Sequence, residues 1–128
     1  QLLREVAAAA VGLIPPGTEV LAGLELGGVP VATALSLATG LPAAFVRKEA
    51  KKYGTAKLAE GAEIAGRRVL IVEDIVTTGG QVVLSARDLR ERGAKLVGAL
   101  TQGVLGGCVF AIGYGLGALA SKGTRAVG

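Results

Sequence analysis

Apolar positions along the chain follow two alternating patterns. Short runs that are almost wholly apolar are typical of strands buried on both faces of a sheet. These runs cover residues 19–23, 43–47, 68–73 and 95–100. Between them, apolar residues recur at helical spacing, and the predicted helices lie before Pro15, over 29–38 and over 81–92. Strands that alternate with helices indicate a doubly wound parallel sheet, so we predict an α/β fold of four to five strands with flanking helices.

The last predicted helix shows a clear division into two faces. Val82, Ala86 and Leu89 should point into the core, whereas the charged residues between them should face solvent. Gly93 is well placed to end this helix. The segment over 49–66 is instead charged and interrupted by glycines, which predicts a mobile loop or a loose hairpin.

Three segments rich in glycine or charge follow the predicted strands. They cover 23–28, 47–53 and 73–80. A parallel sheet carries the C-terminal ends of its strands on one edge, and such sheets bind ligands beyond that edge. The three segments should therefore gather at one rim of the sheet.

The third of these segments has the features of a phosphate-binding loop. Glu73 and Asp74, here called the acid pair, come where the strand should emerge, and two threonines and two glycines follow before the next helix. Glycines let the backbone approach an anion, and a helix N-terminus favours negative charge. The carboxylates would repel a bare phosphate, so they should face sugar hydroxyls or a magnesium ion. These features together suggest a ribose-phosphate ligand.

The charge balance agrees with an anionic ligand and argues against nucleic acid. The chain of 128 residues has a net charge of +4 and only 3% aromatic residues, which is too little for a nucleic-acid surface. Basic residues cluster around the second rim segment, although an ordinary solvated loop would also account for them.

The chain has no histidine, which excludes Ser-His-Asp and Cys-His catalysis and argues against a transition-metal site.

Length and cysteine content set wider limits. A chain of 128 residues is expected to form a single domain. Cys108 is the single cysteine, which excludes an internal disulfide and permits a reducing compartment.

The N-terminus lacks the order of a signal peptide, so we expect a cytoplasmic protein. It also lacks an initiator methionine and reads like the middle of a helix, so we expect a fragment of a longer chain.

The tail of this domain, residues 101–128, diverges in composition from residues 1–100. No acid occurs after Glu91, and residues 96–121 carry no charge. That stretch is long enough for a membrane helix. Its first part is already assigned to the fourth strand and its glycines lower the hydrophobicity, so we do not expect a membrane span. The change in composition also raises the hypothesis of a shifted reading frame, which sequencing of the source DNA would test.

Three stretches carry the loop residues of a known family. They read VLIVEDIVTTGG over 69–80, FVRKEAKKYG over Phe45–Gly54 and GLELGGVP over Gly23–Pro30. They resemble, respectively, the signature, catalytic flexible and pyrophosphate-binding loops of type I phosphoribosyltransferases, in particular orotate phosphoribosyltransferase. The resemblance follows the family's order and spacing over about residues 1–100. It implies a sheet of the type I phosphoribosyltransferase kind and the conversion of orotate and phosphoribosyl pyrophosphate to orotidine 5′-monophosphate and pyrophosphate, in pyrimidine biosynthesis.

The resemblance also implies roles for individual residues. Ribose 5-phosphate would be bound by Glu73, Asp74, Ile75, Val76, Thr77, Thr78, Gly79 and Gly80. Pyrophosphate would be bound by Leu26, Gly27, Gly28, Arg47, Lys48, Lys51 and Tyr53. The catalytic residues would be Arg47, Lys48, Lys51 and Asp74. Mg²⁺ would be held mainly through the substrate, and the active unit would be a homodimer that shares the flexible loop between subunits.

The sequence departs from the family in three places. Members normally follow the fourth strand with an Asp-Arg pair whose arginine binds orotate, but this chain has Thr101-Gln102-Gly103. It lacks the N-terminal hood that contributes base-binding groups, and Tyr53 stands where many members have histidine. The alternatives are a non-catalytic domain that binds phosphoribosyl pyrophosphate as a regulatory ligand, and an inactive or membrane-anchored fragment. The cations of the segment over 47–53 favour the enzyme, because a sensor has no use for them.

Overall fold

The computed structural model describes residues 2–48, 58–75, 80–102, 108–112 and 119–123, which form one seven-stranded sheet with three flanking helices. The helices are α1 (Leu2–Val11), α2 (Gly28–Thr39) and α3 (Gly80–Glu91). The strands are β1 (Val20–Leu24), β2 (Ala43–Val46), β3 (Ala59–Gly61), β4 (Arg68–Ile75), β5 (Lys95–Gln102), β6 (Cys108–Ile112) and β7 (Leu119–Gly123). Their order across the sheet is β3-β2-β1-β4-β5-β6-β7.

The four central strands run parallel and correspond to the four predicted runs. β1 pairs with both β2 and β4, and β4 pairs with β5. The observed bounds of these strands lie within two residues of the predicted ones. The α/β class and the flanking helices are therefore confirmed. The sheet is wider than predicted, because β3, β6 and β7 add antiparallel strands at its two edges.

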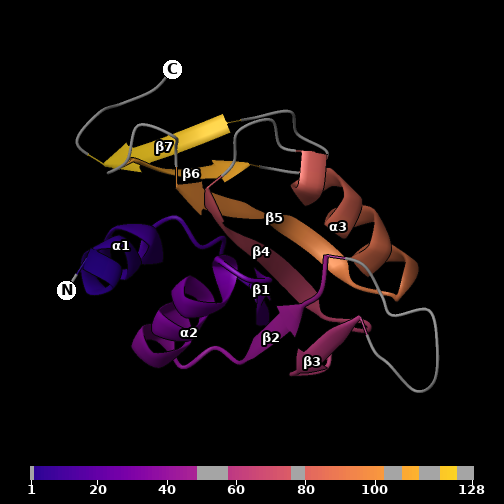
Figure 1. The fold of residues 1–128 in the computed structure, drawn as a ribbon. Coiled ribbons are helices and arrows are strands. Elements are labelled where there is room, and N and C mark those ends of the chain that lie inside the picture. Colours follow the sequence, from indigo (N-terminus) through magenta and orange to yellow (C-terminus); the bar gives the residue numbers. More distant parts are fainter. Residues whose placement is uncertain (1, 49–57, 76–79, 103–107, 113–118, 124–128) are drawn as a thin grey trace.

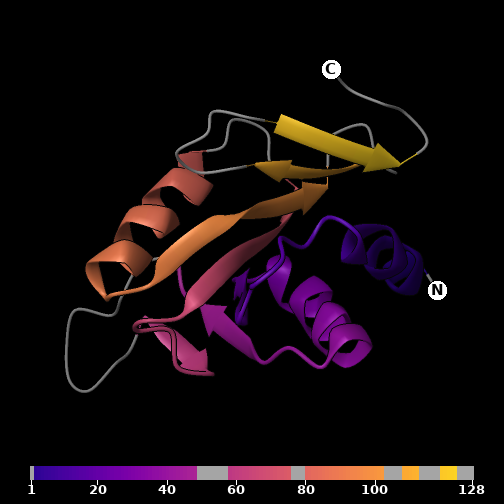
Figure 2. The same ribbon diagram turned by 180° about the vertical axis from the view of Figure 1, so that it is seen from behind.

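Side chains of the central strands alternate between two apolar layers. Val20 and Leu24 of β1 pack in the layer that includes α3. Leu21 of β1 instead packs with Ala10 of α1 and Leu35 of α2. Figures 1 and 2 show the resulting arrangement, with α3 on one face of the sheet and α1 and α2 on the other. Because both faces are covered, the central strands are apolar at successive positions, which explains the continuous runs in the sequence.

Helix α3 has the two faces that its sequence predicts. Val82, Ala86 and Leu89 are at most 3% exposed and belong to the apolar layer between α3 and the sheet. Gly93 follows the helix with a φ of +92°. This left-handed conformation favours glycine and ends the helix at the predicted place.

The two edges of the sheet come from the charged segment and from the tail. Residues 49–57 lie outside the described residues, and the part that follows them forms β3, which pairs with β2 as in a hairpin. In the tail, β6 pairs with β5, and β7 pairs with β6. Within the described ranges, none of the helices has both the length and the apolar character that crossing a membrane requires.

Candidate functional site

The sheet changes its winding direction between β1 and β4. From β1 the chain passes through α2 to β2 on one side, and from β4 it passes through α3 to β5 on the other. The two helices cover opposite faces of the sheet (Figure 1). Open α/β sheets bind ligands at the C-terminal ends of the strands at such a switch point. Two of the predicted rim segments, 23–28 and 73–80, begin there.

Gly27 and Gly28 pack directly against the end of β4. A methyl group on Gly27 would stand 2.6 Å from Asp74 Cβ and 2.9 Å from Asp74 Oδ2. A methyl group on Gly28 would overlap the carbonyl oxygen of Val72 and lie 3.3 Å from Glu73 Cα. A larger residue at either position would have to displace β4. The start of α2, which has no side-chain cap, therefore lies beside the acid pair.

The acid pair lies in an irregular stretch of β4. Val72 pairs with Leu100 and Ile75 pairs with Gln102, so β4 has one more residue than β5 between these pairs. This count corresponds to a β-bulge, which bends a strand and redirects its side chains. Bulges of this kind are frequent next to active sites. The local geometry thus marks the end of β4 as a candidate binding position.

The carboxyl of Glu73 is perturbed by its surroundings. Partial burial raises the pKa of Glu73 above its ordinary value, and the nearby charge of Asp74 raises it further. The Asp74 N–H, which donates a 2.9 Å hydrogen bond to Glu73 Oε1, and the positive charge of Lys48 both oppose this rise in pKa. A partly desolvated carboxylate at a sheet rim is suited to accept hydrogen bonds from hydroxyl groups or to bind a cation.

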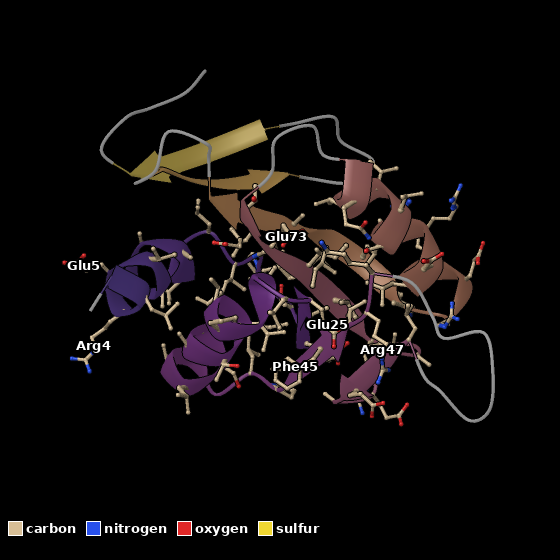
Figure 3. The ribbon with its side chains drawn as sticks, in the orientation of Figure 1. Arg4, Glu5, Glu25, Phe45, Arg47 and Glu73 are labelled. Atoms are coloured by element: carbon tan, nitrogen blue, oxygen red, sulfur yellow. The ribbon has the colours of Figure 1, made fainter. Side chains whose placement is uncertain are left out.

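The second predicted rim segment, residues 47–53, is here called the basic segment and starts at the same rim. The N–H of Glu25 donates to the last carbonyl of β2 at 2.8 Å, which joins the ends of β1 and β2. Arg47 donates its N–H to the carbonyl of Leu58 at 2.9 Å, and its guanidinium lies 3.3 Å from a carboxylate oxygen of Glu60. Figure 3 shows Glu25, Arg47 and Glu73 at the ends of β1, β2 and β4. The described parts of the three predicted segments are therefore neighbours.

The structure places some of the other predicted site residues and leaves several outside its described ranges. Leu26 is 80% exposed at the rim, after a cis peptide bond with Glu25. Ile75 ends β4, and Gly80 begins α3. The predicted residues outside the described ranges are Lys51, Tyr53, Val76, Thr77, Thr78 and Gly79.

Two contacts at the rim were missed by the sequence analysis. Glu60 forms the ion pair with Arg47, and Gln81 Nε2 donates to the carbonyl oxygen of Lys48 at 3.3 Å. The partner of Arg47 depends on the pairing of β2 with β3, for which the sequence has no local signal. The contact of Gln81 also has no local signal, because it depends on how α3 packs against the sheet.

The described residues fit a magnesium ion only with help from a ligand. Among them, no group of three His, Cys, Asp or Glu side chains could hold a metal ion. The acid pair offers carboxylate oxygens, which are the donors that Mg²⁺ prefers. Mg²⁺ commonly combines one or two carboxylates with substrate phosphates and water. The donor set thus fits an ion that the substrate brings with it.

Comparison with known sequences points to one family. A family model described as the phosphoribosyl transferase domain matches residues 1–102. An orotate phosphoribosyltransferase of Nocardioides sp. (strain ATCC BAA-499 / JS614) is 59% identical over 96 residues, which are 75% of this chain and 54% of that protein. An orotate phosphoribosyltransferase of Pyrococcus abyssi is 55% identical over 78 residues, which are 61% of this chain and 43% of that protein. The chain spans about half the length of these relatives.

Solved structures of similar proteins share the fold. Orotate phosphoribosyltransferase of Mycobacterium tuberculosis H37Rv, in complex with 5-phospho-alpha-D-ribosyl 1-diphosphate, is 37% identical with a TM-score of 0.60, over 78% of this chain and 54% of that chain. UMP synthase of Leishmania donovani is 32% identical with a TM-score of 0.67, over 78% of this chain and 22% of that chain. The sheet with its flanking helices is thus the architecture of solved phosphoribosyltransferases.

Proposed function

This chain belongs to the phosphoribosyl transferase domain family, and from that membership we propose that it is part of an orotate phosphoribosyltransferase. The reaction transfers ribose 5-phosphate from phosphoribosyl pyrophosphate to orotate and yields orotidine 5′-monophosphate and pyrophosphate, in UMP biosynthesis. The contact between Gly27 and Asp74 carries the proposal, because it brings the predicted pyrophosphate loop against the predicted ribose-phosphate loop. The 59% identity to an orotate phosphoribosyltransferase supports this particular activity.

The acid pair and the residues after it would hold ribose 5-phosphate. Glu73 and Asp74 would accept hydrogen bonds from the ribose hydroxyls, since ionised carboxylates offer only acceptors. The segment 75–80 would carry the 5′-phosphate with backbone N–H groups, threonine hydroxyls and the N-terminus of α3. The separation of the two functions along the chain keeps the carboxylates away from the phosphate.

The pyrophosphate leaving group would lie between the start of α2 and the basic segment. The bond to C1′ of ribose breaks with oxocarbenium-like character, so negative charge grows on the departing pyrophosphate. Backbone N–H groups of residues 26–28 and the cations Arg47, Lys48 and Lys51 would stabilise that charge, with Tyr53 nearby. Fixed donors and cations act most strongly when water is kept out of the site.

We include magnesium, a homodimer and a cytoplasmic location in the proposal. The acid pair would approach the ion, which neutralises phosphate charge and orients the substrate when it is bound. The family resemblance of the basic segment supports a dimer in which that segment completes the partner's site. The single cysteine, which excludes an internal disulfide, suits a reducing compartment such as the cytoplasm.

Orotate is proposed as the base from the names of the relatives rather than from residues of this chain. Thr101 and Gln102 occupy the place of the family's orotate-binding Asp-Arg pair. The second candidate is a domain that binds phosphoribosyl pyrophosphate without turning it over. The basic segment argues against that candidate, because cations beside a leaving group serve catalysis more than recognition.

Ligand binding can be tested on the chain itself. Phosphoribosyl pyrophosphate with MgCl₂ should raise the melting temperature, because a ligand that binds only the folded state stabilises it. At about a hundred times the dissociation constant the gain in unfolding free energy is about 2.7 kcal/mol. Ribose 5-phosphate should give a smaller rise, since it lacks pyrophosphate. A folded chain whose melting temperature stays unchanged in millimolar ligand would refute the binding site.

A turnover assay separates the enzyme from the sensor. The purified chain is incubated with phosphoribosyl pyrophosphate, Mg²⁺ and orotate, and pyrophosphate release is measured, with adenine, guanine and uracil as competing bases. Release that depends on orotate supports the proposal. Binding of phosphoribosyl pyrophosphate without release for any base would favour the regulatory domain.

A further inference from the structure

Gln81 connects the base of the basic segment to the helix that follows the predicted phosphate loop. Its Nε2 lies 3.3 Å from the carbonyl oxygen of Lys48 and 3.0 Å from Ser85 Oγ. A side-chain amide nitrogen carries two hydrogens, so Gln81 can donate to both oxygens at once. One side chain thereby joins two rim segments that are far apart in the sequence.

Ser85 is the inner anchor of this connection. It is 1% exposed, so its hydroxyl has no access to bulk water and needs a partner within the protein. Gln81 provides that partner from one turn earlier on the same helix, at the spacing where side chains meet. The amide of Gln81 is therefore held over the first turn of α3.

Lys48 is the outer anchor. The pairing of β2 with β3 is extended by the hydrogen bond from the Arg47 N–H to the Leu58 carbonyl. The Lys48 carbonyl comes one residue later, at the start of the basic segment, where Gln81 donates to it. The main chain at this point is held from β3 on one side and from α3 on the other.

We propose that Gln81 is a positioning residue that fixes the base of the basic segment against the N-terminal turn of α3. It thereby sets the distance of Arg47 and Lys48 from the start of α3. The inference rests on the proposed function, because those cations matter only if the ligand carries pyrophosphate. Gln81 acts through the main chain of Lys48, whose charge reaches Glu73 of the acid pair.

Hydrogen exchange tests the contact without any need for turnover. The variant Gln81→Met keeps the length of the side chain and removes both donors. In this variant the Arg47 amide should exchange about fivefold faster, which is the change expected from losing one ordinary hydrogen bond. The amide of Leu21, in the central strand β1, should keep its rate. The affinity for phosphoribosyl pyrophosphate with Mg²⁺, measured by calorimetry, should fall by a similar factor of about five.

Three further variants keep the inference open to refutation. Gln81→Asn is too short to bridge both oxygens and should behave like Gln81→Met, whereas Ser85→Ala removes only the inner anchor and should give a smaller effect. Val83→Met, at an exposed position of the same helix, should change neither quantity. The inference is overturned if Gln81→Met leaves the Arg47 amide and the affinity unchanged, or speeds exchange equally at Leu21. If the unaltered chain does not bind the ligand, the proposed function fails, while the Arg47 amide still reports on the contact.

Discussion

Gly27 lies so close to Asp74 that a methyl group on Gly27 would stand 2.6 Å from Asp74 Cβ. The two residues are distant in the sequence and meet because β1 and β4 are paired neighbours at the switch point of the sheet. The contact leaves no room for a side chain between the predicted pyrophosphate loop and the acid pair. The size of residue 27 therefore controls the distance between the predicted pyrophosphate loop and the acid pair.

Gly27→Ala should weaken ligand binding by pushing these loops apart. Overpacking a tight contact costs about 1–3 kcal/mol. Because Asp74 is at a strand end, we expect the strain to displace the rim more than the core. The affinity for phosphoribosyl pyrophosphate with Mg²⁺ should fall about tenfold or more, with a modest fall in melting temperature. Calorimetry and thermal unfolding measure the two quantities.

Gly40→Ala is the matched control for this substitution. Gly40 ends α2 with a φ of +79°, and nothing lies within 4 Å of the position that a methyl group would take. Alanine there is strained but crowds no neighbour, so it should lower stability by about 1 kcal/mol and leave the affinity unchanged. Equal losses of affinity in the two variants would contradict a specific role for the contact of Gly27 with Asp74.

Asp74→Asn should weaken binding of phosphoribosyl pyrophosphate while the fold stays intact. The amide keeps the size of the side chain but removes the charge and one acceptor, so hydrogen bonds to ribose hydroxyls and the attraction of Mg²⁺ are reduced. We expect a loss of affinity of about tenfold, since hydrogen bonds to charged groups contribute about 1.5–3 kcal/mol. Asp88→Asn makes the same change on α3, away from the rim, and should bind normally. If Asp74→Asn unfolds the chain instead, the residue is structural.

Glu73→Gln should make the chain more stable at neutral pH and flatten the dependence of its stability on pH. Burial raises the pKa of Glu73, so the folded chain holds this proton more tightly than the unfolded chain. The contribution of Glu73 to the free energy of unfolding therefore falls as pH rises from the ordinary pKa of a glutamate through the raised value. The variant cannot titrate there and escapes that fall.

Urea denaturation across about pH 4 to pH 8 measures this effect. The stability difference between Glu73→Gln and the unaltered chain should be small in acid and grow above the raised pKa. Glu63→Gln removes an exposed acid and controls for net charge. A difference that does not change with pH would mean that the carboxyl of Glu73 is not perturbed in the folded chain.

The sequence predicts the central fold well because burial on both faces leaves a strong pattern. Residues such as Leu21 and Leu70 are fully buried, and the short apolar runs that contain them are typical of strands in a sheet covered on both faces. The edges were not predictable in the same way. β3 consists of Ala-Glu-Gly, which has no apolar pattern and is defined by its backbone pairing with β2. The tail is apolar and rich in glycine, so periodicity could not separate a strand from a helix.

The candidate site is predictable to the level of its loops but not of its contacts. The order of strands and helices places the segments after β1, β2 and β4 at one rim, and the structure has their described parts there. The contact of Gln81 with Lys48 joins a side chain to a backbone carbonyl across 33 residues. No local pattern encodes such a contact, because it depends on how α3 packs against the sheet.

Lys51→Ala should lower turnover more than it lowers substrate affinity, in a full-length protein that turns over orotate. Lys51 lies outside the described residues, and its role is a prediction from the sequence. A lysine that meets the leaving group as charge develops acts mainly in the transition state, so its removal lowers kcat. Loss of one such group costs on the order of a hundred- to a thousandfold in rate.

Lys95→Ala is the matched control. It removes the same charge at the opposite end of the sheet, at the start of β5, and should leave kcat unchanged. Steady-state kinetics with phosphoribosyl pyrophosphate as the varied substrate distinguish kcat from KM. If Lys51→Ala kept the kcat of the unaltered protein, the basic segment would serve binding alone, and the regulatory domain would become the better interpretation.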